Sequence, residues 1–279
     1  MERIIKWLTR RPRALDARVN PRNPLSTLPD DLRIHAIGDI HGCADLLARH
    51  HAAIDRGAAE RPKGRIIEVV LGDMIDRGPD SRGVIDQLIE RSRWREIVTL
   101  RGNHENMLLR FLSDPTTLNE WIRFGGLETL LSYGVTPAPT LDADGMVETA
   151  RRAHAAIPAE HVRFLQNTLP IWSCADFVFV HAGLRPGRSL VEQDEHDLLE
   201  IRQPFLQHTG WFGAYVVHGH TPVADIDIRR NRMNLDTGAF ATGRLSGVAL
   251  ERDRLFSLRT NSPQAAAPPP ESALADSGD

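Results

Sequence analysis

The segment Gly72-Asp73-Met74-Ile75-Asp76-Arg77-Gly78 carries the strongest structural signal in this chain of 279 residues. It follows residues 66–71, a short apolar run rich in Ile and Val, which predicts a buried β-strand. Glycines at both ends allow the backbone to turn tightly. Two carboxylates and a guanidinium therefore stand at the carboxyl end of a predicted strand, where open α/β sheets place their ligand sites.

The same arrangement recurs four times along the sequence. Apolar runs at residues 33–37, 97–100, 177–180 and 215–217 each end in a polar cluster. These clusters are Gly38-Asp39-Ile40-His41-Gly42, Gly102-Asn103-His104-Glu105, His181-Ala182-Gly183 and His218-Gly219-His220-Thr221. Helical patterns at residues 44–56 and 81–91 separate the early runs. This alternation predicts an α/β fold with the polar clusters at the carboxyl ends of strands.

The side chains in these clusters are suited to metal binding. They offer carboxylate, imidazole and amide groups without a thiolate, which is a ligand set for Mn, Fe or Zn rather than for a structural zinc site. A carboxylate can bridge two cations, and two metals about 3.5–4 Å apart can polarise one shared hydroxide for attack on phosphorus. A single buried Asp or His is more often a satisfied polar core residue, so the prediction depends on all the clusters together.

The first three clusters resemble the three-part signature of phosphoprotein phosphatases, a branch of the calcineurin-like metallophosphoesterases, in its bacterial and phage form. Symmetrical diadenosine tetraphosphatases share this signature. The segments His181-Ala182-Gly183 and Gly219-His220-Thr221-Pro222 resemble the later histidine motifs of the family. The resemblance runs from residue 32 to about residue 250. It implies a metallophosphoesterase-type β-sandwich flanked by helices, with the metal site at strand carboxyl ends and a helical insertion.

The resemblance also implies two divalent metal ions, with manganese as the first choice and iron or zinc as alternatives. The first metal would be held by Asp39, His41 and Asp73. The ligands of the second metal would be Asp73, Asn103, His181 and His220, so that Asp73 bridges the pair. His218, two residues before His220, is expected to lie behind the ligands.

Further residues are implied to act on the substrate. His104 would be the general acid that protonates the departing alkoxide, and Asp76 would orient His104 and keep it protonated. Arg77 would grip phosphoryl oxygens through its planar guanidinium. Arg202 is expected to do the same from another segment, with Arg185 as the weaker alternative.

The remaining features near these motifs have structural interpretations. Arg101, just before Gly102, is expected to steady its loop. Asp236, in Asn234-Leu235-Asp236-Thr237-Gly238-Ala239, is open to two interpretations, since it would either hydrogen-bond a ligand histidine or cap a turn. Residues 121–130 present an aromatic helix face, which we interpret as packing.

Three parts are expected along the chain. Residues 1–30 are basic and interrupted by prolines, which predicts a loosely ordered leader. Residues 31–260 form the predicted catalytic domain. Within it, residues 106–170 have helical periodicity around a loop with Pro137, Pro139 and Gly145, and predict an insertion beside the site. Residues 261–279 are rich in Ala, Pro and Ser and predict a disordered tail.

The composition argues against several classes of protein. A formal net charge of −3 gives no case for nucleic-acid binding. Cys43 and Cys174 are the only cysteines and match neither a disulfide framework nor a thiolate zinc site. No apolar run approaches the roughly 20 residues that span a bilayer, and the N-terminus lacks the apolar stretch of a signal peptide. We therefore expect a cytoplasmic protein.

The expected reaction is hydrolysis of a phosphoester by a hydroxide that two metals activate. No nucleophile motif such as Gly-x-Ser-x-Gly is present, so no phosphoenzyme is expected. The first interpretation is a protein serine/threonine phosphatase acting on a phosphoprotein or phosphopeptide. The alternative is a hydrolase of a diadenosine polyphosphate or similar nucleotide, and the third is a catalytically silent binding module. An open groove at residues 106–170 would favour the peptide, whereas a closed pocket with a base-stacking aromatic would favour the nucleotide.

Overall fold

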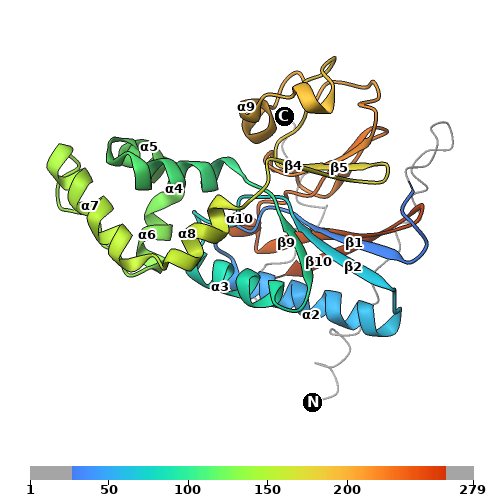
Figure 1. The fold of residues 1–279 in the computed structure, drawn as a ribbon, viewed down its shortest axis with the longest axis horizontal. Coiled ribbons are helices and arrows are strands. Elements are labelled where there is room, and N and C mark those ends of the chain that lie inside the picture. The colour runs from blue at the N-terminus through green and yellow to red at the C-terminus, as the bar shows by residue number, and fades with distance from the viewer. Residues whose placement is uncertain (1–26, 262–279) are drawn as a thin grey trace, which may run out of the picture.

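The computed structural model describes residues 27–261 (Figure 1). The predicted leader and tail lie outside the described residues, except for residues 27–30 and residue 261. The described chain begins in contact with the core, because Leu28 is buried and its N–H donates to the carbonyl of Arg252 over 3.1 Å. Across residues 27–261, no helix combines the length and the apolar character that crossing a membrane requires.

The core is a sandwich of two five-stranded sheets, ordered β10-β9-β1-β2-β3 and β4-β5-β6-β8-β7. The first sheet contains β1 (Leu32–Ile37), β2 (Arg65–Val70), β3 (Glu96–Thr99), β9 (Arg244–Glu251) and β10 (Arg254–Asn261). The second contains β4 (Ile171–Cys174), β5 (Phe177–Val180), β6 (Tyr215–His218), β7 (Asp227–Ile228) and β8 (Arg232–Asn234). The neighbours β1, β2 and β3 pair in parallel, as do β5, β6 and β8. The five polar clusters therefore follow parallel strands.

Alternation along the strands separates two apolar layers. Ile34 and Ile67 of the first sheet pack with Phe179 and Met233 of the second, and all four side chains are fully buried. The opposite face of the first sheet is covered by α2 (Ala44–Glu60) and α3 (Ser81–Ser92), which lie along it in Figure 1. These helices have the apolar stripe that such a position requires.

The outer face of the second sheet is covered as well. Val178 and Val216 pack there with Phe205 and with Leu198 of α9 (Glu195–Glu200). A short 3-10 turn, η3 (Leu190–Glu192), precedes this helix, and α10 (Ala239–Thr242) connects β8 to β9. The predicted fold class, two sheets flanked by helices, is confirmed.

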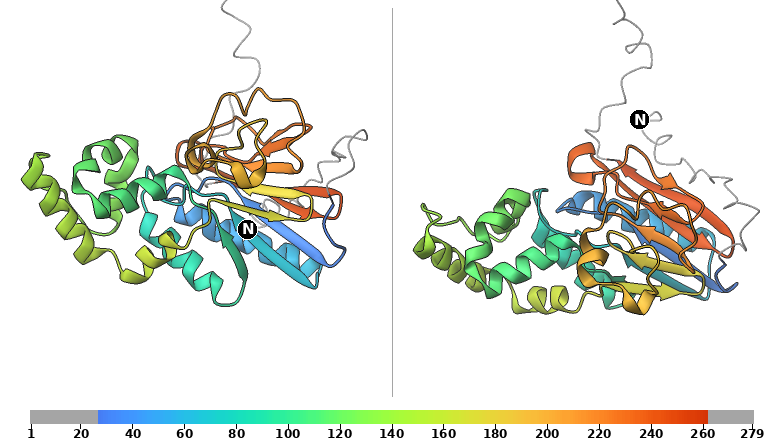
Figure 2. Two further views of the ribbon diagram at one scale, coloured as in Figure 1. Left: turned by 45° about the horizontal axis from the view of Figure 1, so that its top comes forward. Right: turned by 90° about the horizontal axis from the view of Figure 1, so that it is seen from above.

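The region predicted as an insertion is mostly helical and projects from one end of the sandwich (Figures 1 and 2). It contains α4 (Asn103–Ser113), η1 (Pro115–Thr117), α5 (Leu118–Trp121), the π-helical turn η2 (Ile122–Gly126), α6 (Leu127–Ser132), α7 (Ala143–Ala156) and α8 (Ala159–Gln166). A parallel bridge between Leu100 and Leu169 ties its last residues to the first sheet.

The helices of the insertion differ from the prediction in two places. Residues 119–132, part of the stretch predicted to have helical periodicity, do not form one continuous helix, because the φ of 100° at Gly125 lies outside the helical region. Gly145, predicted to lie in a loop, belongs to the first turn of α7. Its N–H donates to the side chain of Asp142 over 2.9 Å, so Asp142 caps this helix.

A buried charged cluster lies between the first sheet and its helices. Glu68 on β2 accepts two hydrogen bonds of 2.6 Å from the guanidinium of Arg91, which also pairs with Asp55 at 2.8 Å. His35 on β1 is 3% exposed, and neither of its ring nitrogens has a hydrogen-bond partner in the described chain. Burial, and then the nearby Arg33, lower the pKa of His35 to about 3, so this imidazole is neutral in the folded protein.

Candidate metal and active site

The five polar clusters meet at one end of the sandwich and bring the predicted ligands together. Four of the six predicted ligands are at most 2% exposed, Asn103 is 8% exposed and His220 is partly buried. The four are Asp39, His41, Asp73 and His181. Such deep burial of carboxylates and imidazoles is costly unless each is paired or bound to a metal.

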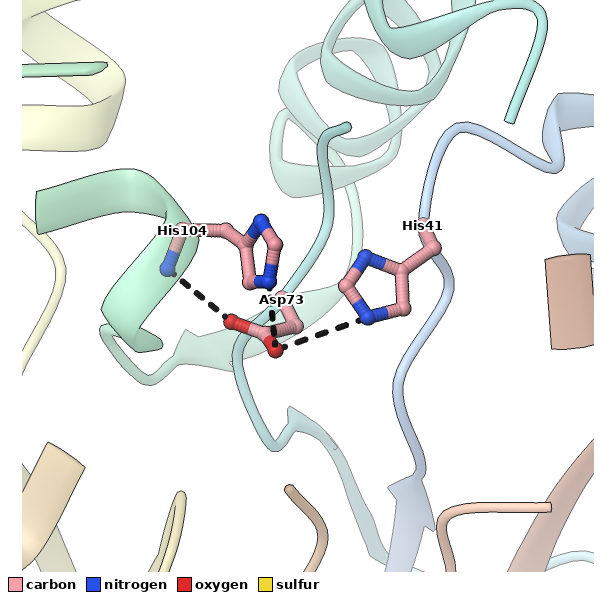
Figure 3. Close-up of side chains that lie close together, drawn as sticks. All are labelled: His41, Asp73 and His104. Carbon is pink, nitrogen blue, oxygen red and sulfur yellow. Dashed lines mark hydrogen bonds and ion pairs between the residues drawn. The ribbon is translucent and has the colours of Figure 1, made fainter. Parts of the chain in front are cut away.

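Asp73 lies between His41 and His104 (Figure 3). Its Oδ2 lies 3.5 Å from Nε2 of His41, and its Oδ1 lies 3.4 Å from Nε2 of His181. Oδ1 also accepts the backbone N–H of His104 over 3.2 Å. The two carboxylate oxygens thus face two different histidines, as a bridging carboxylate requires.

Two overlapping groups of side chains could each hold a metal ion. One contains His41, Asp73 and His104, and the other contains Asp73, His181 and His220. Within each group the ligand atoms lie within 4.8 Å of one another. Asn103 adds an amide oxygen to the second group, because its Oδ1 lies 3.1 Å from Nε2 of His181 and 3.1 Å from Nδ1 of His220.

Backbone carbonyls fix the orientation of two of the predicted ligand histidines. Nδ1 of His41 donates to the carbonyl of Ile75 over 2.9 Å, and Nδ1 of His181 donates to the carbonyl of Leu71 over 2.9 Å. A ring nitrogen that donates carries a proton, so Nε2, which faces Asp73 in each ring, is the nitrogen that a metal ion would bind. Hydrogen bonds of this kind are typical of histidines that ligate metals.

The site concentrates negative charge. Burial raises the pKa of Asp39 well above its usual range, and the neighbouring carboxylates Asp236 and Asp73 raise it further. Burial alone would raise the pKa of Asp73, but His181 and His104 lower it below its usual range. Burial opposes the charge on His181, yet Asp73 and Asp39 raise its pKa to about 10. A field that holds a proton on a buried imidazole also attracts a divalent cation.

A buried carboxylate oxygen without a hydrogen-bond partner also indicates that the site binds a cation. Oδ2 of Asp39 accepts the backbone N–H of His220 over 2.9 Å, whereas Oδ1 is buried without a hydrogen-bond partner in the described chain. A buried carboxylate oxygen without a partner is rare in folded proteins. Together with the imidazole and carboxylate donors around Asp73, it fits a divalent cation.

Backbone strain is concentrated at the same place. Among residues 27–261, seven residues other than glycine have positive φ, and five of them belong to the polar clusters. These five are His41, Asp73, Asp76, Arg77 and His220. Left-handed backbone is uncommon for such residues and is found at functional sites, where the surrounding structure enforces it.

Two glycines leave room for the carboxylates. A Cβ atom at Gly102 would overlap Oδ1 of Asp73, and a Cβ atom at Gly219 would overlap Oδ1 of Asp39. Any other residue at either position would displace a carboxylate. The glycines of these motifs are therefore required by close approach.

His104 and Asp76 form the predicted pair. Nδ1 of His104 donates to Oδ2 of Asp76 over 2.7 Å, and both side chains are fully buried. Burial disfavours the charged imidazole, but Asp73 and Asp76 outweigh burial and raise the pKa of His104. Two residues of the insertion also bind Asp76, because Trp121 Nε1 donates over 2.8 Å and Thr129 Oγ1 donates over 2.6 Å. The insertion thus holds the carboxylate that orients His104.

Arg77 lies between two rings of the site. Its Nη1 is 3.1 Å from Nε2 of His41, and its Nη2 is 3.0 Å from Nε2 of His104. Its backbone N–H donates to the carbonyl of Gly125 over 3.0 Å, so the π-helical turn of the insertion also supports this residue. A guanidinium in this place is positioned for a phosphoryl group bound beside His41 and His104.

The structure distinguishes the two arginines proposed for the other side of the site. Arg185 pairs with Asp197 through two contacts of 2.5 Å. Arg202 is exposed, donates to Oγ1 of Thr221 over 3.3 Å, and its charge acts on the adjacent His220. Of the two arginines, Arg202 is therefore the one whose guanidinium lies near the predicted ligand His220.

Three other expectations can be compared with the structure. His218 is buried behind the site, donates from Nδ1 to the carbonyl of Gly219 over 3.0 Å and packs edge-on against Phe205. Asp236 caps a turn, since its Oδ1 accepts the N–H of Gly238 over 2.8 Å. Arg101 steadies its loop by donating to Oγ1 of Thr168 over 3.1 Å.

Glu105 has a role that we did not predict. It is fully buried, and its Oε2 accepts the N–H groups of Gly102 and Asp73 over 2.8 and 2.9 Å. Its Oε1 accepts the N–H of Met74 over 2.7 Å. Glu105 thus holds the loop that carries Asp73 against the start of α4. The signal available in the sequence was a Glu three residues after Gly102, because a Glu at the third helical position can accept the N–H of the residue that begins the helix.

A comparison with protein-family models agrees with this geometry. The model described as calcineurin-like phosphoesterase matches residues 32–233. The chain belongs to the calcineurin-like phosphoesterase family. The resemblance stated from the motifs is therefore confirmed.

Curated relatives of this phosphoesterase have a common name. An asymmetrical bis(5'-nucleosyl)-tetraphosphatase PrpE from Anoxybacillus flavithermus is 28% identical over 254 residues, which cover 82% of this chain and 95% of the relative. The protein of the same name from Bacillus subtilis is 26% identical over 255 residues, covering 81% and 94%. These relatives favour the nucleotide hydrolase over the protein phosphatase that we placed first.

Solved structures share the fold of this phosphoesterase. A candidate diadenosine tetraphosphatase superposes with a TM-score of 0.58 at 21% identity, covering 84% of this chain and 96% of the other. A cold-active protein tyrosine phosphatase superposes with a TM-score of 0.56 at 16% identity, covering 85% and 82%. At this level of identity the likeness establishes the fold.

Proposed function

We propose that this phosphoesterase hydrolyses dinucleoside polyphosphates, with a bis(5'-nucleosyl) tetraphosphate as its substrate. The main support is the alignment with relatives of that name, which extends over 82% of this chain and 95% of one relative. A match over nearly the whole relative includes the insertion as well as the metal-binding motifs. The proposal reverses the order of the first two of our three interpretations from the sequence.

We assign two divalent cations to the site. One would be held by Asp39, His41 and Asp73. The ligands of the other would be Asp73, Asn103, His181 and His220. The placement of the two oxygens of Asp73 and the orphaned oxygen of Asp39 support this division. When bound, two cations such as manganese would act as Lewis acids that activate water and neutralise phosphoryl charge.

Side chains of the protein would supply the proton for the leaving group and the positive charge that binds the phosphoryl oxygens. His104 would give a proton to the leaving group, and Asp76 keeps its ring oriented with Nε2 on the side of Arg77. Arg77 and Arg202 would bind phosphoryl oxygens from two sides of the ligand group.

A comparison of catalytic efficiency on three substrates tests the proposal. We would compare kcat/KM for diadenosine tetraphosphate, a phosphoserine peptide and p-nitrophenyl phosphate with manganese present, and repeat each assay with a chelator. The expected result is preferential, chelator-sensitive hydrolysis of the dinucleotide into a nucleoside monophosphate and a nucleoside triphosphate, which are the unequal products of asymmetrical cleavage. A more than hundredfold preference for the phosphoserine peptide would overturn the proposal.

A further inference from the structure

An exposed aromatic ring borders the metal-binding residues. Phe240 lies on α10 and is 42% exposed. Its ring packs edge-on against that of His41, with centroids 5.4 Å apart, and the guanidinium of Arg77 lies 5.1 Å from its centroid. One side chain at the water interface therefore touches both a candidate ligand and the candidate phosphate-binding arginine.

Exposure alone would not make Phe240 informative, because single exposed apolar residues are normal in folded proteins. Trp94 is an example, since it is 59% exposed and its ring contacts Arg91 and Arg95 on the helical side of the first sheet. Phe240 differs by its position. A phosphoryl group bound by Arg77 would lie next to the ring of Phe240.

The turn that carries Phe240 is firmly held. The N–H groups of Ala241 and Thr242 both donate to the carbonyl of Gly238 over 2.9 Å, and Oγ1 of Thr242 donates to the carbonyl of Thr237 over 2.9 Å. The N–H of Gly238 is in turn bound by Asp236. A ring on such a support can serve as a platform, because little entropy is lost when a ligand covers it.

We propose that Phe240 is the platform on which one nucleobase of a dinucleoside polyphosphate stacks while its phosphates reach the metal-binding residues. Base stacking on an aromatic side chain needs only a flat π face and tolerates every base. The inference rests on the proposed function, which supplies the nucleoside. It assigns selection for nucleotides over other phosphoesters to a residue outside the insertion.

The test compares a ligand with bases and a ligand without them. We would measure KM for diadenosine tetraphosphate and the inhibition constant of inorganic tripolyphosphate in the wild type, Phe240→Ala, Phe240→Leu and Phe240→Trp. Leucine keeps the apolar bulk but has no π face, so it reports on stacking even if alanine perturbs the fold. Removing one stacked base should raise KM about tenfold in the Ala and Leu variants. The kcat value, the inhibition constant and the Phe240→Trp variant should stay within about twofold of wild type.

Each contrary result has a distinct meaning. If Phe240 only positions Arg77 or His41, the Ala and Leu variants will lose affinity for tripolyphosphate or lose kcat as well, which would overturn the inference. Trp94→Ala is the matched control and should change nothing. A rise in KM in Phe124→Ala but not in Phe240→Ala would place the base against the insertion instead, because the exposed Phe124 precedes the Gly125 that binds Arg77. A wild type that does not hydrolyse the dinucleotide would refute the proposed function itself.

Discussion

Replacing His104 with asparagine would separate acid catalysis from metal binding. The imidazole is fully buried, its Nδ1 donates to Asp76 over 2.7 Å, and its Nε2 lies 3.8 Å from Oδ2 of Asp73. Asparagine is similar in reach but does not titrate, so it cannot protonate a leaving group. The six proposed metal ligands stay in place in this variant.

The size of the effect should depend on the leaving group. A positioned general acid contributes about 10²–10⁴-fold to a rate, so His104→Asn should lower kcat for phenyl phosphate by that amount. The departing p-nitrophenolate is a weaker base and needs less help, so kcat for p-nitrophenyl phosphate should fall by about tenfold or less. A nucleoside polyphosphate is also a weak base, and the loss on diadenosine tetraphosphate should be similarly small.

Two measurements test whether His104 acts as a general acid or as a metal ligand. Steady-state kinetics on the two aryl phosphates give the dependence on the leaving group, and inductively coupled plasma mass spectrometry gives the metal ions bound per chain. The metal content should equal that of the wild type. A loss of metal would place His104 among the ligands, as its presence in one of the two metal-binding groups allows. Equal losses on both substrates with metal retained would refute the acid role.

Three further predictions concern the ligands and the buried charges. Asp73→Asn should lower the metal content and the activity together, because it weakens the carboxylate proposed to serve both cations; a fully loaded but inactive variant would contradict bridging. Glu68→Gln should lower the free energy of unfolding in urea by about 3 kcal/mol, since it breaks a buried pair with Arg91, whereas the exposed Glu96→Gln should cost less than about 1 kcal/mol. His35 has a pKa of about 3 when folded, against an ordinary value of 6.5, so the unfolded chain binds a proton first and stability is lost as the pH falls from 6.5 towards 3. His35→Leu should therefore reduce the loss of stability between pH 7.5 and pH 5 by about 2 kcal/mol, and an unchanged pH dependence would show that His35 is not neutral in the fold.

Much of the fold and the candidate ligand set could be read from the sequence because the signals are local. The strand at residues 177–180 was predicted with its observed bounds, and the runs before Asp39, Asp73 and Asn103 were predicted within one residue at each end. Each of these runs is short and apolar and is followed at once by its polar cluster, so a few neighbouring residues carry the signal. The helix α7 escaped prediction because its start looked like the end of a loop rich in proline and glycine.

The support of the site could not be predicted in this way. Trp121 and Thr129 bind Asp76 from 45 and 53 residues along the chain, and nothing in their own segment marks them as partners of a carboxylate. The resemblance already placed Arg202 ahead of Arg185, but the pairing that occupies Arg185 depends on where Asp197 lies after α9 has packed against the second sheet.

The amino-acid sequence by itself determined that five strands end in metal-binding side chains, because strand period, glycine position and ligand type are all properties of neighbouring residues. Only the tertiary structure decided which distant residues complete the site: the insertion that holds Asp76, the glutamate that clamps the loop of Asp73, and the ring of Phe240 beside Arg77. Such contacts form when separate segments pack together, and their partners are chosen by the geometry of that packing rather than by any pattern along the chain.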